Sequence, residues 1–201
     1  GRRRLAEDLH SYLKKQEEKT MEMKLQGEKI YLACLEREDC KTLWMEFEYD
    51  SEHPTEEFNI GHSWEKADGW FDEIQKLQGS QNVRLGIFRK DGTVIGDVAL
   101  QEIDRFHRKC SVGIGIAKLE NRGKGYGKEA VLLMLDYGFR YLGMERITAN
   151  TLECNTAMQR VLEHCGFLQE GRERKAVYFN GEKQDRLCYG ILKEEYFNEG
   201  K

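Results

Sequence analysis

The chain has 201 residues, of which 39% are hydrophobic and 34% charged, and its formal net charge is −4. This length and apolar content suit one folded domain rather than a disordered chain, and the lack of a basic excess argues against a nucleic-acid-binding protein. No apolar run approaches the roughly 18 residues of a membrane span, and we recognise no signal peptide, so we expect a cytoplasmic protein that contacts neither nucleic acid nor membrane.

The first half of the chain predicts strands and helices in alternation. Residues 1–24 form a charged extension, which is either foreign to the domain or a peripheral helix, and residues 25–201 are expected to form a single domain. The hydrophobic pattern predicts a strand at 30–35, a helix at 36–47, a loop over 50–64, a helix at 63–77 capped by Ser63, and a hairpin of strands at 83–89 and 93–103. Asp91-Gly92 in this hairpin is typical of a type I′ turn.

The second half begins with a predicted strand at 110–117, which a glycine-rich segment separates from a long amphipathic helix at 126–142. The remaining predicted elements are a strand at 146–152, a helix at 156–165 that ends at Gly166, and a hairpin of 175–179 and 186–192 that turns at Asn180-Gly181. Hairpins thus flank one strand–helix–strand unit. This order predicts a mixed α/β sheet rather than a purely parallel one.

The glycine-rich segment 122–128 has the sequence RGKGYGK. Alternate glycines allow backbone N–H groups to converge on a ligand, because no Cβ blocks its approach. The start of the following helix adds unpaired N–H donors and a positive dipole end, and Arg122 and Lys124 add positive charge. The segment therefore fits a pyrophosphate-binding loop, and from these residues alone an ordinary surface turn fits equally well.

Two known phosphate-binding motifs differ from this segment. A P-loop requires Gly-Lys followed by Ser or Thr, but here Glu129 follows that pair, which excludes it. A Rossmann fingerprint is nearer, because G-x-G-x-x-A occurs at 125–130 and Glu153 ends the next strand. However, the polar segment 118–122 separates the glycines from the strand, and the chain offers only one βαβ unit. A dinucleotide-binding protein is therefore the weaker alternative.

The whole pattern resembles the GNAT N-acetyltransferase superfamily. Segment 122–127 is similar to its R/Q-x-x-G-x-G/A loop for the pyrophosphate of acetyl-CoA, in the same order of strand, loop, long helix, strand, helix and Gly166-Phe167. Over about residues 27–197 the chain looks most similar to the branch of ribosomal-protein N-terminal acetyltransferases (RimJ/RimL type) and spermidine acetyltransferases. The motifs that carry this likeness are Ile30-Tyr31-Leu32, Glu38-Asp39, Asn155-Thr156-Ala157, Arg160-Val161-Leu162-Glu163, Glu170-Gly171-Arg172, Asn180-Gly181 and Asp185.

This resemblance implies a GNAT-like fold: a mostly antiparallel twisted sheet with a central, splayed pair of parallel strands at 110–117 and 146–152, and helices on both faces. It implies a transferase (an acyltransferase) that moves acetyl from acetyl-CoA, its co-substrate, directly to a primary amine of a protein N-terminus, a polyamine or another small molecule. A homodimer is common in this branch. The implied cofactor-binding residues are Ile114, Gly115, Ile116, Ala117, Arg122, Gly123, Lys124, Gly125, Tyr126, Gly127, Lys128, Asn155 and Arg160.

The usual acid–base residues of the family do not carry over to this chain. Many relatives have Tyr where this chain has Leu162, and many have Glu where it has Ser111. Glu102, at the end of the adjacent strand, is our candidate general base, and Ser111 is a candidate for positioning a water molecule. The simpler interpretations are a solvated carboxylate and a hydrogen-bonded strand serine. A non-catalytic acyl-CoA-binding module therefore stays an alternative to the enzyme.

The remaining chemistry-bearing residues give weaker signals. The six cysteines form no C-x-x-C pair, and no histidines have zinc-ligand spacing, so no metal site is expected. An acidic run hints at a cationic acceptor, and a solvated charged face is the simpler interpretation. The residues of this run are Glu46, Glu48, Asp50, Glu52, Glu56 and Glu57.

Overall fold

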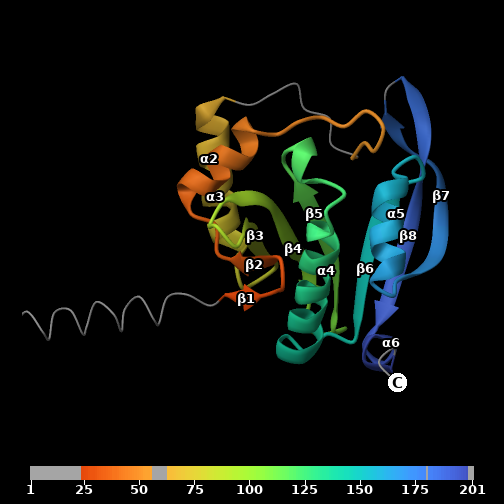
Figure 1. Ribbon diagram of the computed structural model, residues 1–201. Helices are drawn as coiled ribbons and strands as arrows, with labels where there is room; N and C mark the ends of the chain where they lie inside the picture. The colour runs from red at the N-terminus through yellow and green to blue at the C-terminus, as the bar shows by residue number, and fades with distance from the viewer. Residues whose placement is uncertain (1–23, 56–62, 180, 199–201) are drawn as a thin grey trace, which may run out of the picture.

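The computed structural model describes residues 24–55, 63–179 and 181–198, so the predicted extension lies outside the described residues apart from Lys24. Within them, eight strands form one sheet in the order β1-β2-β3-β4-β5-β6-β8-β7 (Figure 1). All neighbouring pairs are antiparallel except β5 and β6, which confirms the predicted mixed sheet with one parallel pair. The strands are β1 (Leu25–Gln26), β2 (Ile30–Ala33), β3 (Val83–Arg89), β4 (Val94–Asp104), β5 (Lys109–Ile116), β6 (Arg146–Leu152), β7 (Leu168–Phe179) and β8 (Glu182–Leu192).

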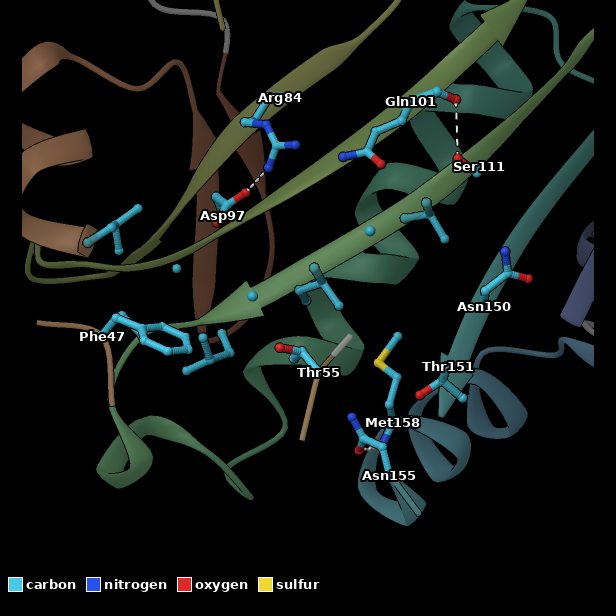
Figure 2. A pocket seen from close by; sticks show the side chains of 18 of the residues that line it. Phe47, Thr55, Arg84, Asp97, Gln101, Ser111, Asn150, Thr151, Asn155 and Met158 are labelled. Atoms are coloured by element: carbon cyan, nitrogen blue, oxygen red, sulfur yellow. Dashed lines mark hydrogen bonds and ion pairs between the residues drawn. The ribbon is translucent and has the colours of Figure 1, made fainter. Parts of the chain in front are cut away.

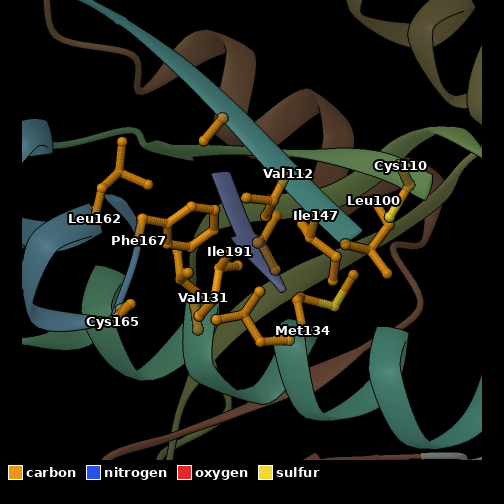
Figure 3. Packing of buried hydrophobic residues seen from close by; sticks show 14 of the residues in the cluster. Leu100, Cys110, Val112, Val131, Met134, Ile147, Leu162, Cys165, Phe167 and Ile191 are labelled. Carbon is orange, nitrogen blue, oxygen red and sulfur yellow. The ribbon is translucent and has the colours of Figure 1, made fainter. Parts of the chain in front are cut away.

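Helices cover both faces of the sheet, as predicted. They are α2 (Arg37–Met45), α3 (Trp64–Leu77), α4 (Tyr126–Asp136), α5 (Thr156–His164) and α6 (Lys193–Asn198), with a 3₁₀ turn η1 (Leu119–Asn121) and a π-helical turn η2 (Tyr137–Tyr141). The main core lies between the sheet and α4 and α5 (Figure 3). A smaller core packs α2 and α3 against the opposite face of the sheet. Consecutive side chains of a strand point to opposite faces, and of the neighbours in β3, Ile87 belongs to the main core and Phe88 to the smaller one. None of the helices in the described residues has the length and apolar content that crossing a membrane requires.

The local signals for helix ends agree with the structure. Ser63 caps α3, because its hydroxyl accepts a hydrogen bond from the N–H of Lys66 at 3.2 Å. Gly166 follows α5 with a φ of +88°, a conformation that a residue without Cβ adopts at little cost. The predicted strand at 146–152 is β6, and the predicted helix at 126–142 is α4 continued by η2.

Two hairpins differ in detail from the prediction. Gly92 has a positive φ but Asp91 does not, so the predicted type I′ turn, which needs both, is wrong. The N–H of Gly92 donates to Arg89 O and the N–H of Arg89 to Thr93 O, both at 2.9 Å, as in a three-residue loop with a bulge. Strand β7 begins at Leu168, well before the predicted start at residue 175. The sequence did not indicate this first part of the strand, because its side chains are mostly exposed and show little hydrophobic alternation.

Candidate active site

The parallel strands β5 and β6 separate soon after they begin. They pair only at Lys109–Arg146, Cys110–Ile147 and Ser111–Thr148. Beyond Ser111 a cavity of about 680 Å³ opens along β5, with residues of β3 and β4 on one side and of β6 and α5 on the other. Figure 2 shows this arrangement: Arg84 and Asp97 lie across β5 from Asn150 and Thr151.

The edge of β5 that faces β6 offers backbone hydrogen-bonding groups to the cavity. Ala117 donates its N–H to Ile95 O of β4 at 3.0 Å. Since backbone groups of a strand point to alternate sides, those of Ile116 and Ile114 point away from β4, into the gap. Accordingly, Ile116 O accepts hydrogen bonds from Arg122 at 3.0 and 3.3 Å. An extended ligand between β5 and β6 would therefore meet the N–H and C=O of Ile114.

The glycine-rich segment leads into the first turn of α4. Gly123 and Gly125 have φ of +70° and +85°, and Gly125 is the N-cap, with no side chain that caps the helix. The N–H of Glu129 donates to Gly125 O at 3.1 Å, so by helix geometry the preceding N–H groups of the first turn have no intrahelical acceptor. A Cβ on Gly127 would lie 3.6 Å from Ile114 Cδ1, so these donors sit beside β5 at the gap.

Arg122 binds other parts of the chain instead of pointing freely to a ligand. Its Nη1 lies 3.0 Å from Asp50 Oδ2, in addition to the bonds to Ile116 O. Burial raises the pKa of Asp50, but hydrogen bonds from the backbone N–H groups of His53 and Glu52 and from the side chains of His53 and Arg122 lower it, and the net pKa lies below its ordinary value. Asp50 is thus favoured in its charged form, as the partner of Arg122 in an ion pair.

Asn155 is likewise engaged within the chain. It caps α5 by accepting a hydrogen bond from the N–H of Met158 at 3.0 Å, and its Nδ2 donates to Pro54 O at 3.1 Å. The side chain is buried and lines the cavity. Arg160 is exposed on α5, where its carbonyl accepts a bond from His164 Nδ1 at 2.6 Å. Asn155, the N-cap of α5, and Met158 within the helix line the cavity, whereas Arg160 does not.

Arg122 and Asn155 both hold residues 46–55, which we call the crossing segment. Figure 1 shows it in orange, running from α2 over the end of β5 towards the β7–β8 hairpin. Glu48 donates its N–H to Ala117 O at 2.8 Å, and its carboxylate accepts the N–H of Leu119 at 2.7 Å. From the sequence, the acidic residues of this segment were interpreted as a solvated charged face or as a site for a cationic acceptor, and contacts within the chain were not expected. Glu48 and Asp50 instead bind the chain itself, and Glu56 and Glu57 lie outside the described residues.

The two predicted catalytic residues lie together at the cavity. Ser111 Oγ donates to Glu102 Oε2 at 3.3 Å or to Gln101 O at 3.4 Å. Glu102 is exposed and has a φ of +53°, a conformation that non-glycine residues rarely adopt. The register between β4 and β5 shifts between Gln101 and Asp104, so Glu102 lies in a β-bulge. Both residues line the cavity.

Two tryptophans and an ion pair between Arg84 and Asp97 also line the cavity. Trp44 and Trp70 meet edge to face, with ring centroids 5.4 Å apart. Arg84, which pairs with Asp97, lies 5.7 Å from the Trp70 ring. Trp64, at the start of α3, is 59% exposed and does not line the cavity. Among the described residues, no group of three or more acidic, His or Cys side chains is arranged to hold a metal ion.

Comparison with known proteins identifies the family of the chain. The family model of the acetyltransferase (GNAT) domain matches residues 29–168. The chain is 35% identical over 109 residues to the putative ribosomal N-acetyltransferase YdaF of Bacillus subtilis, which covers 54% of this chain and 59% of that protein. It is 32% identical over 133 residues to the spermidine N(1)-acetyltransferase of Vibrio cholerae, covering 64% and 76%. A solved structure described as a probable acetyltransferase has a TM-score of 0.74 at 26% identity, covering 88% of this chain and 99% of that one.

The chain belongs to the GNAT acetyltransferase family. This confirms the family and the fold expected from the sequence. The match to YdaF spans less than two thirds of that protein's length, so membership of the family does not by itself give the activity or the substrates of this chain.

Proposed function

We propose that this protein is an acetyl-CoA-dependent N-acetyltransferase that transfers acetyl directly to the amine of a small molecule. The observation that carries the proposal is the gap between β5 and β6, with the free first-turn N–H groups of α4 beside Ile114 at its edge. These groups fit the two parts of acetyl-CoA that any enzyme must hold. The N–H donors and the helix dipole suit the pyrophosphate, and the backbone edge of β5 suits an extended amide chain.

Acetyl-CoA supplies the acetyl group as an activated thioester. The chain's own residues would do the rest. The N–H of Ile114 would stabilise the negative charge that develops on the acetyl carbonyl oxygen. Glu102 would remove a proton from the amine, directly or through a water molecule held by Ser111, since amines of this kind are mostly protonated at neutral pH. The thiol leaving group, with a pKa of about 8.5, needs little help from an acid, which suits a site with Leu162 at the usual Tyr position.

The members of the proposed cofactor-binding set have different roles. Gly123, Lys124, Gly125, Tyr126, Gly127 and Lys128 would bind the pyrophosphate, and Ile114 to Ala117 would bind the pantetheine arm. Arg122 and Asn155 would act through the crossing segment, because their polar groups already bind Asp50, Ile116 and Pro54. Arg160 is kept in the proposal only as an exposed positive charge on α5.

A polyamine is the first acceptor class to test. The name of the Vibrio cholerae relative supports a small amine of this kind, and Glu102 in the cavity supplies a carboxylate for a cation. The non-catalytic module and the dinucleotide-binding protein are not favoured, because the named relatives are N-acetyltransferases. A single domain over 25–201, a homodimer and a cytoplasmic location also stay proposals.

Release of the free thiol from acetyl-CoA, measured with spermidine, a monoamine and a short peptide as acceptors, tests the function. We expect amine-dependent release, with Glu102→Gln lowering kcat about a hundredfold and leaving the KM for acetyl-CoA nearly unchanged. Glu194→Gln, at an exposed glutamate of α6, is the matched control and should retain full activity. Cofactor binding without thiol release for any amine would instead favour the non-catalytic module.

A further inference from the structure

The β-bulge in β4 decides which way Glu102 points. Val98 and Leu100 of this strand belong to the main core under α4, and in a regular strand residue 102 would share their face. The register instead shifts, so that from Gln101 to Asp104 the strand has one residue more than β5 has from Ser111 to Lys109. As a result, Ile103 packs against the core, and Glu102 lines the cavity next to Gln101.

This arrangement requires Glu102 to hold an unfavourable backbone conformation. Its φ of +53° makes it one of three non-glycine residues with positive φ in the part of the chain that the structure describes. A side chain with a Cβ rarely adopts this region, and such residues persist only where their surroundings hold them. The contacts of the Glu102 backbone are therefore part of the site.

Asn82 provides the contact that holds this backbone. Its side-chain Oδ1 accepts the N–H of Glu102 at 3.2 Å, and the carbonyl of the preceding residue, Gln81, accepts the N–H of Ile103 at 2.9 Å. Strand β3, the neighbour of β4 on this side, pairs only from Val83 onward, where it meets Leu100. The Asn82 side chain thus supplies the acceptor that a longer β3 would have supplied.

The loop that carries Asn82 is itself well fixed. Three successive N–H groups, of Ser80, Gln81 and Asn82, lie 3.1 to 3.2 Å from Leu77 O at the end of α3. Gln78 bonds both backbone groups of Arg84, through Nε2 to its carbonyl at 3.0 Å and through Oε1 to its N–H at 2.9 Å. Asn82 is half-buried and does not line the cavity, so it can affect the site only through the residues that it contacts, such as Glu102.

We propose that Asn82 is a positioning residue for Glu102. By accepting the N–H of Glu102, it holds the bulge in the conformation that directs the carboxylate into the cavity beside Ser111. This inference rests on the proposed function, in which Glu102 removes the proton of the acceptor amine.

Steady-state kinetics of four variants test this role: Asn82→Ala, Asn82→Asp, Glu102→Gln and the double variant Asn82→Ala/Glu102→Gln. We expect Asn82→Ala to lower kcat at least about tenfold, because small displacements of a catalytic group are costly, with the KM for acetyl-CoA within about twofold of wild type. Asn82→Asp keeps an oxygen acceptor on the same carbon and should restore most of kcat. In the Glu102→Gln background, Asn82→Ala should cause no further loss, since it acts through Glu102.

The matched control is Asp91→Ala. Asp91 Oδ1 accepts the N–H of Thr93 at 3.0 Å at the other end of the same hairpin, so this variant removes a similar side-chain acceptor far from the cavity. It should leave kcat unchanged. Equal losses of kcat from Asn82→Ala in both backgrounds, or no loss in either, would show that Asn82 does not act through Glu102 and would overturn the proposal.

Amide hydrogen exchange, followed by NMR, gives a second readout that does not depend on turnover. We expect the Glu102 N–H to exchange at least about tenfold faster in Asn82→Ala than in wild type, and at nearly the wild-type rate in Asn82→Asp. Unchanged exchange in Asn82→Ala would overturn the role of Asn82 even in an inactive protein. Wild-type protein without activity on any amine, together with the expected exchange rates, would contradict the proposed function alone.

Discussion

At the scale of single residues, the glycines of segment 122–128 have different tasks. Gly125 has a φ of +85°, which strains any residue with a Cβ, and it is the N-cap of α4. Gly127 lies inside the first turn without a positive φ, and an added Cβ would make an ordinary contact of 3.6 Å with Ile114 Cδ1. The backbone conformation therefore requires glycine at 125 and tolerates alanine at 127.

We predict that Gly125→Ala lowers the free energy of unfolding by about 1–2 kcal/mol, the usual cost of the left-handed region. Gly127→Ala should be neutral or raise the free energy of unfolding by up to about 1 kcal/mol, because alanine restricts the unfolded chain and favours the helix. Urea denaturation of both variants measures the difference. Equal losses in the two variants would contradict this division of tasks.

Asp50 makes the crossing segment sensitive to acid. Its folded-state pKa lies below the ordinary value, so between the folded and unfolded pKa values the unfolded chain binds more protons. The stability that Asp50 contributes is thus fully present above the unfolded pKa of about 3.9 and is lost as the pH falls towards the folded pKa. We expect Asp50→Asn to be less stable than wild type at pH 7, and this difference to shrink between about pH 5 and pH 3. Urea denaturation across this range measures it, and a difference that stays constant with pH would contradict the role of Asp50.

At the scale of elements, the end of α4 approaches the sheet closely. Gly138 lies in the π-helical turn η2, and a Cβ there would lie 2.8 Å from Ile147 Cδ1 and 3.1 Å from Leu100 Cδ1. Both partners are fully buried in the main core, which leaves them little room to move. Gly138 thus allows the helix to pack directly on β4 and β6.

We predict that Gly138→Ala lowers the free energy of unfolding by about 1–3 kcal/mol through overpacking. Ile147→Val removes the clashing Cδ1, so the double variant should lose less than the sum of the two single variants. Gly69→Ala in α3 is the matched control, because nothing lies within 4 Å of its added Cβ, and it should raise the free energy of unfolding by up to about 1 kcal/mol. Urea denaturation measures all four variants, and additive losses would show that the contact with Ile147 is not the cause.

Elements with strong local signals could be predicted from the sequence, and contacts between distant segments could not. The capped helix α3 and the helix that begins after the glycine-rich segment have periodic patterns and recognisable ends. Arg122 and Asn155 were predicted as cofactor ligands, but their partners Asp50 and Pro54 lie 72 and 101 residues away in sequence, and no local pattern indicates them. Of the cofactor-binding residues that the family resemblance implied, Ile114 to Ala117 and Asn155 line the cavity, and the resemblance did not indicate which residues bind each other.

At the scale of the whole molecule, the cavity lies where the parts of the fold meet. Its walls come from β3 to β6 and β8, from α2, α3 and α5, and from Phe47, Pro54 and Thr55 of the crossing segment. The strand–helix–strand unit with flanking hairpins predicted a mixed sheet, and the resemblance to the GNAT superfamily implied the splayed parallel pair that opens the gap. The positive φ of Glu102 and the ion pair of Arg84 with Asp97 depend on contacts between segments that are distant in sequence. They could therefore be found only in the structure.

The measurement that tests the central claim most directly is thermal unfolding with and without acetyl-CoA, with NAD and ATP as controls. A ligand at about 100 times its Kd stabilises the folded state by about 2.7 kcal/mol, which corresponds to a rise in Tm of roughly 5–10 °C for a chain of this size. We expect this rise with acetyl-CoA alone, and a much smaller one for Gly125→Ala relative to its own Tm without ligand. No rise with acetyl-CoA up to millimolar concentration, or a rise with NAD in its place, would contradict the assignment of the gap and the glycine-rich segment to acetyl-CoA.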